Sequence, residues 1–290
     1  MNFRSLVRAF VVAVAMQAPI GKTHAFDEAK YPDWKGQWSR VPGAGPSIYG
    51  GGGWDPSKPE GRGQQAPLTD EYQKIFEANL ADQTDGGTGT WYGTTCRSHG
   101  MPAIMNVFFP MEIVVLPDTT YIVANDVHVY VRRIFTDGRE WPDNIEPAFI
   151  GGLSLGKWID EDGDGRYDAL EFETRGFKGP RAFDLSGIPL HEDNLTVIKE
   201  RIYLDKADRN LLHNQVTVID HALTGPWTVV KNYRRNANPR PVWPEQECAE
   251  GQGHVQIGNE NYMMSGDGSL MPTKKGQTPP DLRYFKPTGK

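Results

Sequence analysis

The sequence lacks a basic excess, a long apolar run in its body and several common catalytic signatures. It has 37 acidic against 31 basic residues and a net charge of −6, so nucleic acid is not an expected partner. Beyond the N-terminal leader no segment approaches the roughly 18 uninterrupted apolar residues of a membrane span. A complete phosphate loop, a dinucleotide fingerprint and a His-Glu-x-x-His motif are missing. We therefore expect no nucleotide or haem cofactor.

The leader itself has the pattern of an export signal. Arg4 and Arg8 precede an apolar stretch from Ala9 to about Ala18, which is too short to cross a membrane. Thr23 and Ala25 then supply the small residues that signal peptidase requires before its cleavage site. We expect a mature protein that begins near Phe26 and is periplasmic or secreted.

Cysteine is scarce, with only Cys96 and Cys248 in the chain. In an oxidising compartment an isolated pair predicts a disulfide, which here would close a loop of about 150 residues. Two alternatives stay open at this point. The thiols could be free, or Cys96 with His99 and Cys248 with His254 could bind zinc.

What the chain has in abundance is turn-forming and aromatic residues. It contains 32 Gly and 22 Pro and is 11% aromatic, which is typical of short strands joined by turns. From Met111 onwards, apolar residues alternate or form short runs. We expect a mainly all-β protein, an antiparallel barrel or strongly curved sheet of about eight strands that holds a small ligand in its mouth. The expected strands are residues 112–116, 121–125, 127–135, 153–159, 169–175, 195–204, 211–220 and 227–233.

One short helix is predicted before these strands. Thr69 precedes two acidic residues and apolar side chains spaced three and four apart, and the pattern ends before Asp82. The expected organisation is a signal peptide at 1–25, an irregular Gly- and Trp-rich lead-in with this helix at 26–95, a β-barrel-like domain at 96–258 and a surface tail at 259–290.

The sharpest local motif lies at residues 160–171, here called the acidic loop. It matches the twelve-residue calcium loop, with oxygen ligands at alternate positions and a glycine, Gly165, at position 6. The flanking residues do not favour helices, and an acidic hairpin turn is the alternative. If calcium is bound, the predicted ligands are Asp160, Asp162, Asp164, Asp168 and Glu171.

The β-rich region contains an ordered set of short strings: Cys96 with Gly100-Met101-Pro102, residues 132–139 (Arg-Arg-Ile-Phe-Thr-Asp-Gly-Arg), 152–158, 173–177, Glu200-Arg201 and Pro226-Trp227-Thr228. Together these strings resemble a family of uncharacterised exported bacterial β-rich proteins. The resemblance implies a secreted β-rich domain with a shared polar centre, and it implies no activity. The acidic loop and His99 depart from the pattern of that family.

Because alternate residues of a strand share one face, the pattern of the predicted strands points to four residues for a polar centre. His128 and Arg132 share one face of a strand, Glu200 lies in an apolar row of another, and His191 lies just before that second strand. A cavity lined by these groups would exchange protons with a substrate. The alternatives are a solvated outer face for His128 and Arg132, and a structural ion pair between Glu200 and Arg132 or Arg201.

Two functions follow. The first is a secreted cofactor-independent enzyme, a lyase, isomerase or hydrolase, that acts by acid–base chemistry on a small, largely apolar molecule in a barrel cavity. The second is a non-catalytic ligand-binding or structural envelope protein, stabilised by calcium if the acidic loop binds it. In both cases the expected partner is a small molecule, and the sequence does not indicate the oligomeric state.

Overall fold

The structure is a computed structural model of the 290-residue chain. It describes residues 26–44, 53–90, 96–106, 109–125, 129–145, 151–243, 247–248, 253–258, 260–278 and 280. The predicted signal peptide and His128 lie outside the described residues. Among the helices within those ranges, none has the length and apolar character needed to cross a membrane.

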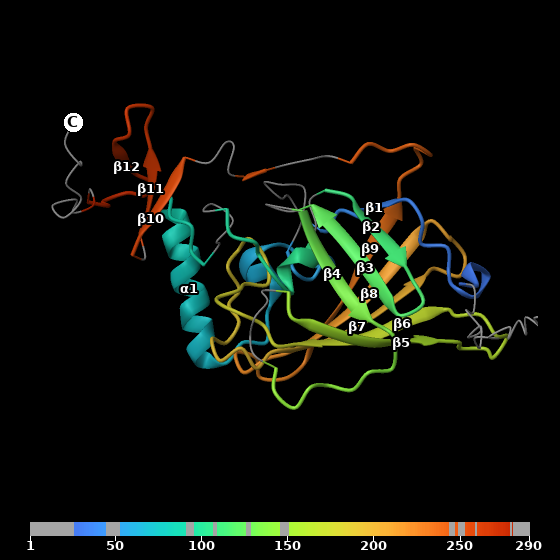
Figure 1. The fold of residues 1–290 in the computed structure, drawn as a ribbon. Coiled ribbons are helices and arrows are strands. Elements are labelled where there is room, and N and C mark those ends of the chain that lie inside the picture. Colours follow the sequence, from blue (N-terminus) through green and yellow to red (C-terminus); the bar gives the residue numbers. More distant parts are fainter. Residues whose placement is uncertain are drawn as a thin grey trace, which may run out of the picture.

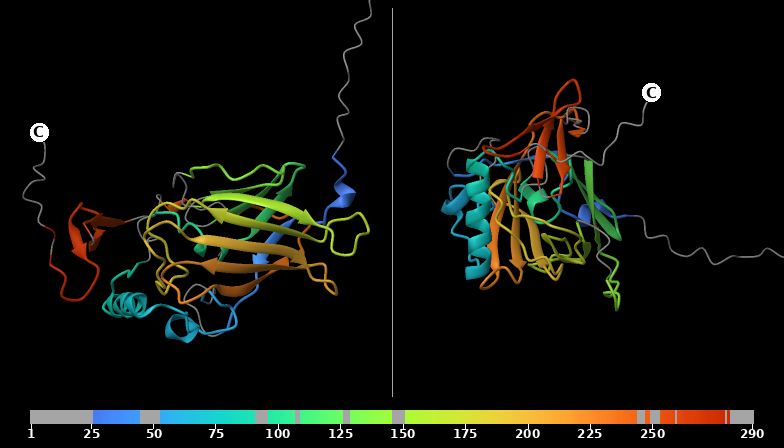
Figure 2. Two further views of the ribbon diagram at one scale, coloured as in Figure 1. Left: turned by 90° about the horizontal axis from the view of Figure 1, so that it is seen from below. Right: turned by 90° about the vertical axis from the view of Figure 1, so that its left-hand side faces the viewer.

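Nine strands form a closed barrel in which sequence neighbours are also spatial neighbours (Figures 1 and 2). This confirms the predicted mainly β class and adds one strand to the expected eight. All pairs are antiparallel except β4 and β5, which run parallel. The barrel strands are β1 Gln37–Arg40, β2 Met111–Val115, β3 Thr119–Asn125, β4 Val129–Phe135, β5 Leu153–Ile159, β6 Ala169–Arg175, β7 Val197–Leu204, β8 Leu211–Ile219 and β9 Trp227–Arg235.

The additional strand is β1, which lies in the predicted irregular lead-in. It pairs with both β2 and β9 through Trp38, opposite Met111 on one side and Arg235 on the other, and so closes the barrel. Trp38 is completely buried. Four residues are too few to show a clear alternation, which is why the barrel begins at Gln37 in the structure and at residue 96 in the sequence prediction.

Helix α1, Asp70–Thr84, confirms the predicted helix and extends it beyond Asp82. The Thr69 hydroxyl accepts a hydrogen bond from the backbone N–H of Tyr72, which satisfies one of the unpaired donors at the helix start. Tyr72 and Phe76 are buried in the main core. The bridge between Leu68 and Leu223 ties the start of the helix to the β8–β9 connection, at one end of the barrel.

The barrel interior is filled by a short 3₁₀ helix, η4, Ala103–Asn106, all four residues of which are buried. The Tyr233 hydroxyl donates to the backbone oxygen of Met105 at 2.8 Å. The Lys231 ammonium donates to Asn106 Oδ1 at 2.5 Å. Because Tyr233 and Lys231 point inward from β9, these bonds hold η4 within the barrel as part of the core.

The C-terminal region forms a separate three-stranded sheet rather than the expected aperiodic tail, although it does lie on the surface (Figure 1). The Lys274 ammonium holds it against α1 through Asp82, at 2.9 Å. Its strands are β10 His254–Ile257, β11 Glu260–Met264 and β12 Leu270–Pro272. Within the described ranges, the other short elements are the 3₁₀ helices η1 Glu28–Lys30 and η2 Gly61–Gln64.

Candidate functional site

Two of the four residues predicted for the polar centre meet inside the barrel. Arg132 on β4 and Glu200 on β7 form a two-point ion pair, with Nη1 to Oε1 at 3.1 Å and Nη2 to Oε2 at 2.5 Å. Their side chains are 1% and 0% exposed. This is the fork-to-fork geometry in which a guanidinium binds a carboxylate most strongly.

Further contacts surround this pair, although the Arg132 Nε, which is buried, has no hydrogen-bond partner among the described residues. Asn214 of β8 donates to Glu200 Oε1 at 2.8 Å, and the Arg132 guanidinium contacts Met105 Sδ at 3.1 Å and lies over the Phe172 ring at 5.3 Å. The carboxylate is therefore held by two donors away from solvent. Such geometry favours the structural ion pair, and the acid–base roles of Arg132 and Glu200 stay a prediction.

The inward face of β4 is the polar one. Arg132 and Ile134 are buried, whereas Val129 and Val131 on the opposite face are 49% and 48% exposed. The alternation of side chains along the strand assigned these residues to the correct faces, but it did not tell which of the two faces is solvated. The structure turns Arg132 inward because the Glu200 carboxylate on β7 is there to receive it, which removes the solvated-face alternative for Arg132.

His191 lies elsewhere. It sits in the connection before β7, where its ring is 5.4 Å from Tyr72 of α1 and 5.5 Å from the His221 ring. Its Nδ1 is 3.1 Å from the Asp193 carboxylate. The structure thus brings together Arg132 and Glu200 and places His191 in a separate cluster at the α1 end of the barrel.

The sequence analysis did not select two buried cations, Arg181 and Lys231, of which Lys231 is the more deeply buried. Lys231 on β9 is fully buried, and burial lowers its pKa well below the ordinary value. Its ammonium lies 3.9 Å from the centre of the Trp54 ring and bonds the Trp54 backbone oxygen and Asn106. The alternation of side chains along β9 would have identified Lys231 as inward-facing, because it shares a face with the buried Val229 and Tyr233.

The string from Gly152 to Gly156 has the Gly-x-Ser-x-Gly spacing of serine hydrolases. Its Ser154 is inside β5, is 2% exposed and shares a hydrogen bond with Thr174 at 2.9 Å. A nucleophile elbow instead presents its serine on a sharp turn between a strand and a helix. The fold therefore gives Ser154 a packing role.

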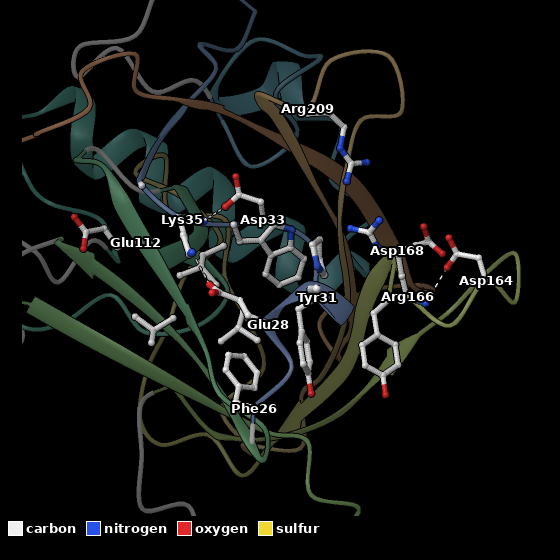
Figure 3. A pocket seen from close by; sticks show the side chains of 18 residues that line it. Phe26, Glu28, Tyr31, Asp33, Lys35, Glu112, Asp164, Arg166, Asp168 and Arg209 are labelled. Carbon is white, nitrogen blue, oxygen red and sulfur yellow. Dashed lines mark hydrogen bonds and ion pairs between the residues drawn. The ribbon is translucent and has the colours of Figure 1, made fainter. Parts of the chain in front are cut away.

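A cavity of about 850 Å³ lies at the opposite end of the barrel from α1 (Figure 3). Strand β1 pairs with β2 only at Met111 and Glu112, so the next residues of β2 border open space. The segment that leads into β1 and the β5–β6 and β7–β8 connections complete its wall. The lining residues are Phe26, Glu28, Ala29, Tyr31–Gly36, Glu112–Val115, Asp164, Arg166–Asp168 and Arg209.

Aromatic rings form one side of this end cavity. The Tyr31 ring packs on Tyr167 at 5.2 Å and edge-on against Trp158 at 5.0 Å, and Trp34 lies 5.0 Å from Trp158. Burial is the main cause that raises the pKa of the Tyr31 phenol. The sequence analysis did not select these residues. A signal existed only for Tyr31 and Trp34, which lie in a lead-in that is rich in aromatic residues and has no strand periodicity.

Charged side chains surround the rings. In Figure 3, Arg166 and Arg209 lie on the same side of the cavity, near Asp164 and Asp168. Within the ranges that the structure describes, neither arginine side chain forms an ion pair. The two guanidinium groups are hydrogen-bond donors beside stacked rings, in a cavity that is also lined by the carboxylates of Glu28, Asp33 and Glu112.

The acidic loop, which contributes to this cavity, folds as a tight turn between β5 and β6. Both oxygens of Asp160 accept backbone N–H donors, from Gly163 at 2.8 Å and Gly165 at 2.9 Å. Carboxylate oxygens of Asp160, Asp162 and Asp168 lie within 4.8 Å of one another. Asp164 accepts the N–H of Arg166, and Glu171 forms an ion pair with Arg201 at 2.5 Å, so three of the five predicted ligands converge.

The predicted disulfide is present. Cys96 and Cys248 are bonded, with their Cα atoms 5.5 Å apart. Since both sulfur atoms are used in this bond, the alternatives of free thiols and of a zinc site built on the cysteines do not apply.

No protein-family model, curated protein or solved structure matches this chain. The resemblance to exported β-rich proteins stays a prediction, and the function has to be argued from the geometry of the chain itself.

Proposed function

We propose that this protein is an exported small-molecule-binding protein whose ligand occupies the end cavity. The observation that carries the proposal is the aromatic wall beside two unpaired arginines. A volume of about 850 Å³ lies within the range of small-ligand sites, roughly 300–1,000 Å³. The N-terminal leader pattern and the disulfide support a periplasmic or secreted location.

The chemistry of the wall indicates the class of ligand. Tyr31 and Tyr167 offer ring faces and edges to a planar apolar body. Arg166 and Arg209 offer donors to a carboxylate or a similar anion. We therefore propose an aromatic carboxylate or a closely similar organic anion as the ligand.

Binding should be visible in tryptophan fluorescence, because Trp34 and Trp158 pack against the cavity wall. We expect indole-3-acetate or 2-naphthoate to change the emission of the mature protein, and their neutral amides to bind at least about tenfold more weakly, the equivalent of about 1.4 kcal/mol. Arg209→Ala should remove the preference for the acid over the amide. Tyr31→Ala should weaken the binding of the acid and of the amide to a similar extent.

Arg62→Ala is the matched control, because Arg62 is ion-paired with Glu77 beside α1, at the opposite end of the barrel from the cavity. It should bind as the parent does. Equal affinity for acids and amides in the parent, or unchanged binding by Tyr31→Ala, would contradict the proposed site.

We also propose that the acidic loop binds calcium and thereby stiffens one wall of the end cavity. Asp160, Asp162 and Asp168 supply the carboxylates, and the loop backbone orients Asp160. Extracellular loops of this type bind calcium with Kd near 10⁻⁴–10⁻³ M. At ten times Kd the folded protein would gain about 1.4 kcal/mol.

Millimolar calcium should accordingly raise the melting temperature, and Asp162→Ala should abolish the rise. Glu171→Gln tests whether Glu171 is a calcium ligand or only the ion-pair partner of Arg201. If Glu171 stays with Arg201, as in the structure, this variant keeps the calcium response, whereas the twelve-residue motif predicts its loss. Differential scanning calorimetry of the three proteins with and without calcium measures these shifts. A parent melting temperature that does not change when calcium is added would contradict the proposal.

A further inference from the structure

A second cluster of ligating side chains lies at the α1 end of the barrel. Strands β7 and β8 are antiparallel with Val197 opposite Ile219, so the residues before β7 lie beside those after β8. This pairing brings His191 and Asp193 next to His221. Asp193 Oδ2 is 3.1 Å from His191 Nδ1 and 2.6 Å from His221 Nδ1. One ligand atom from each of the three residues lies within 4.8 Å of the other two.

The backbone around this cluster is held by a buried carboxylate. Asp220 Oδ1 accepts the N–H of His191 at 2.8 Å and the N–H of Ala222 at 2.9 Å. Its Oδ2 accepts the hydroxyl of Thr196, whose oxygen in turn accepts a donor from Arg181 at 2.8 Å. Asp220 therefore ties the connection that carries His191 to the one that carries His221.

The individual ligands are also oriented. Asp193 Oδ1 accepts the N–H of Leu195 at 3.0 Å, which leaves Oδ2 facing both imidazoles. The Tyr72 ring and the backbone N–H of Asp193, which donates to His191 Nδ1 at 3.1 Å, hold the His191 ring, and a metal bound at Nδ1 would take the place of that hydrogen bond. Supporting contacts of this kind are what position the ligands of protein metal sites.

The spacing suits a small divalent ion. Zn–N and Zn–O bonds of about 2.0–2.2 Å in a tetrahedron separate ligand atoms by roughly 3.4 Å. The two observed separations, 2.6 and 3.1 Å, need to open by less than about 1 Å. The ion would replace the proton that His221 Nδ1 shares with Asp193. The side chain of His221 is 65% exposed, so a fourth position faces solvent.

We propose that His191, Asp193 and His221 form a binding site for a divalent transition metal, Zn²⁺ in the first instance, with water as the fourth ligand. Two imidazoles and one carboxylate are a donor set that zinc uses in proteins, whereas calcium takes oxygen ligands alone. This site is separate from the end cavity and from the acidic loop, and it does not depend on the proposed ligand-binding function.

The test is isothermal titration of the EDTA-treated, dialysed mature protein with zinc chloride, in millimolar calcium so that the acidic loop is occupied by its own ion. We expect saturable binding of one zinc per chain and a rise in melting temperature. His221→Ala and Asp193→Asn should each weaken binding by at least tenfold. Asp220→Asn, which removes an orienting group and no ligand, should weaken it by about 10–100-fold.

His213→Ala is the matched control. The ring of His213 also faces a carboxylate, Asp205 at 3.1 Å, but its second neighbour is Asn232 rather than another histidine. This variant should bind zinc as the parent does. Absence of saturable heat, or equal binding by the parent and His221→Ala, would overturn the proposal. Because His221 is largely exposed, its replacement tests the site without disturbing the core. Cobalt(II) substitution adds an independent measurement, since a tetrahedral site should give visible absorption that His221→Ala loses.

Discussion

Replacing Glu200 by glutamine should lower the free energy of unfolding by about 3–5 kcal/mol, because it leaves the buried Arg132 guanidinium without a counter-charge. The amide keeps the shape of the side chain, so the loss is electrostatic and not a packing defect. Urea denaturation of parent and variant measures the effect through the shift in midpoint at constant slope.

Two further variants identify the cause. Glu77→Gln removes a carboxylate from the solvent-exposed pair with Arg62 and should leave the midpoint essentially unchanged. Arg132→Met combined with Glu200→Leu removes both charges and should recover much of the stability lost in Glu200→Gln. An unchanged midpoint for Glu200→Gln would contradict the structural role of the pair and would favour the acid–base role predicted from the sequence.

Loss of the disulfide should have an effect of similar size. Cys96 and Cys248 are 152 residues apart, and closing a loop of that length reduces the entropy of the unfolded chain by an amount worth about 5 kcal/mol. The double variant Cys96→Ser/Cys248→Ser should therefore denature at a much lower urea concentration than the parent. The closed loop contains β2 to β9, so the effect is expected on the barrel as a whole.

Intact mass before and after reduction and alkylation provides the chemical control. The oxidised protein should take up alkylating reagent only after reduction, and the single variant Cys96→Ser should be as unstable as the double variant. Alkylation of both thiols without reductant, or equal midpoints for parent and double variant, would refute this account.

Local patterns determined much of the fold. The strands from β2 to β9 were predictable because alternation of apolar residues requires only that one face of a strand be buried. Helix α1 was predictable from the cap at Thr69 and the spacing of Tyr72 and Phe76, which are local properties of the chain. The disulfide was predictable because the N-terminal sequence has the pattern of an export signal, and an isolated cysteine pair in an oxidising compartment usually forms a bond.

Only the tertiary structure decided which residues meet. Arg132 and Glu200 are 68 positions apart in the sequence. Alternation tells which residues of a strand share a face, but it does not tell which face is inside the barrel. β1, four residues long, has too little pattern to be recognised, and it becomes a strand because the barrel has two edges for it to pair with. His191 meets His221 because β7 and β8 are antiparallel. Side-chain contacts of this kind depend on strand register and barrel closure, which are properties of the whole assembly of strands and not of any one segment.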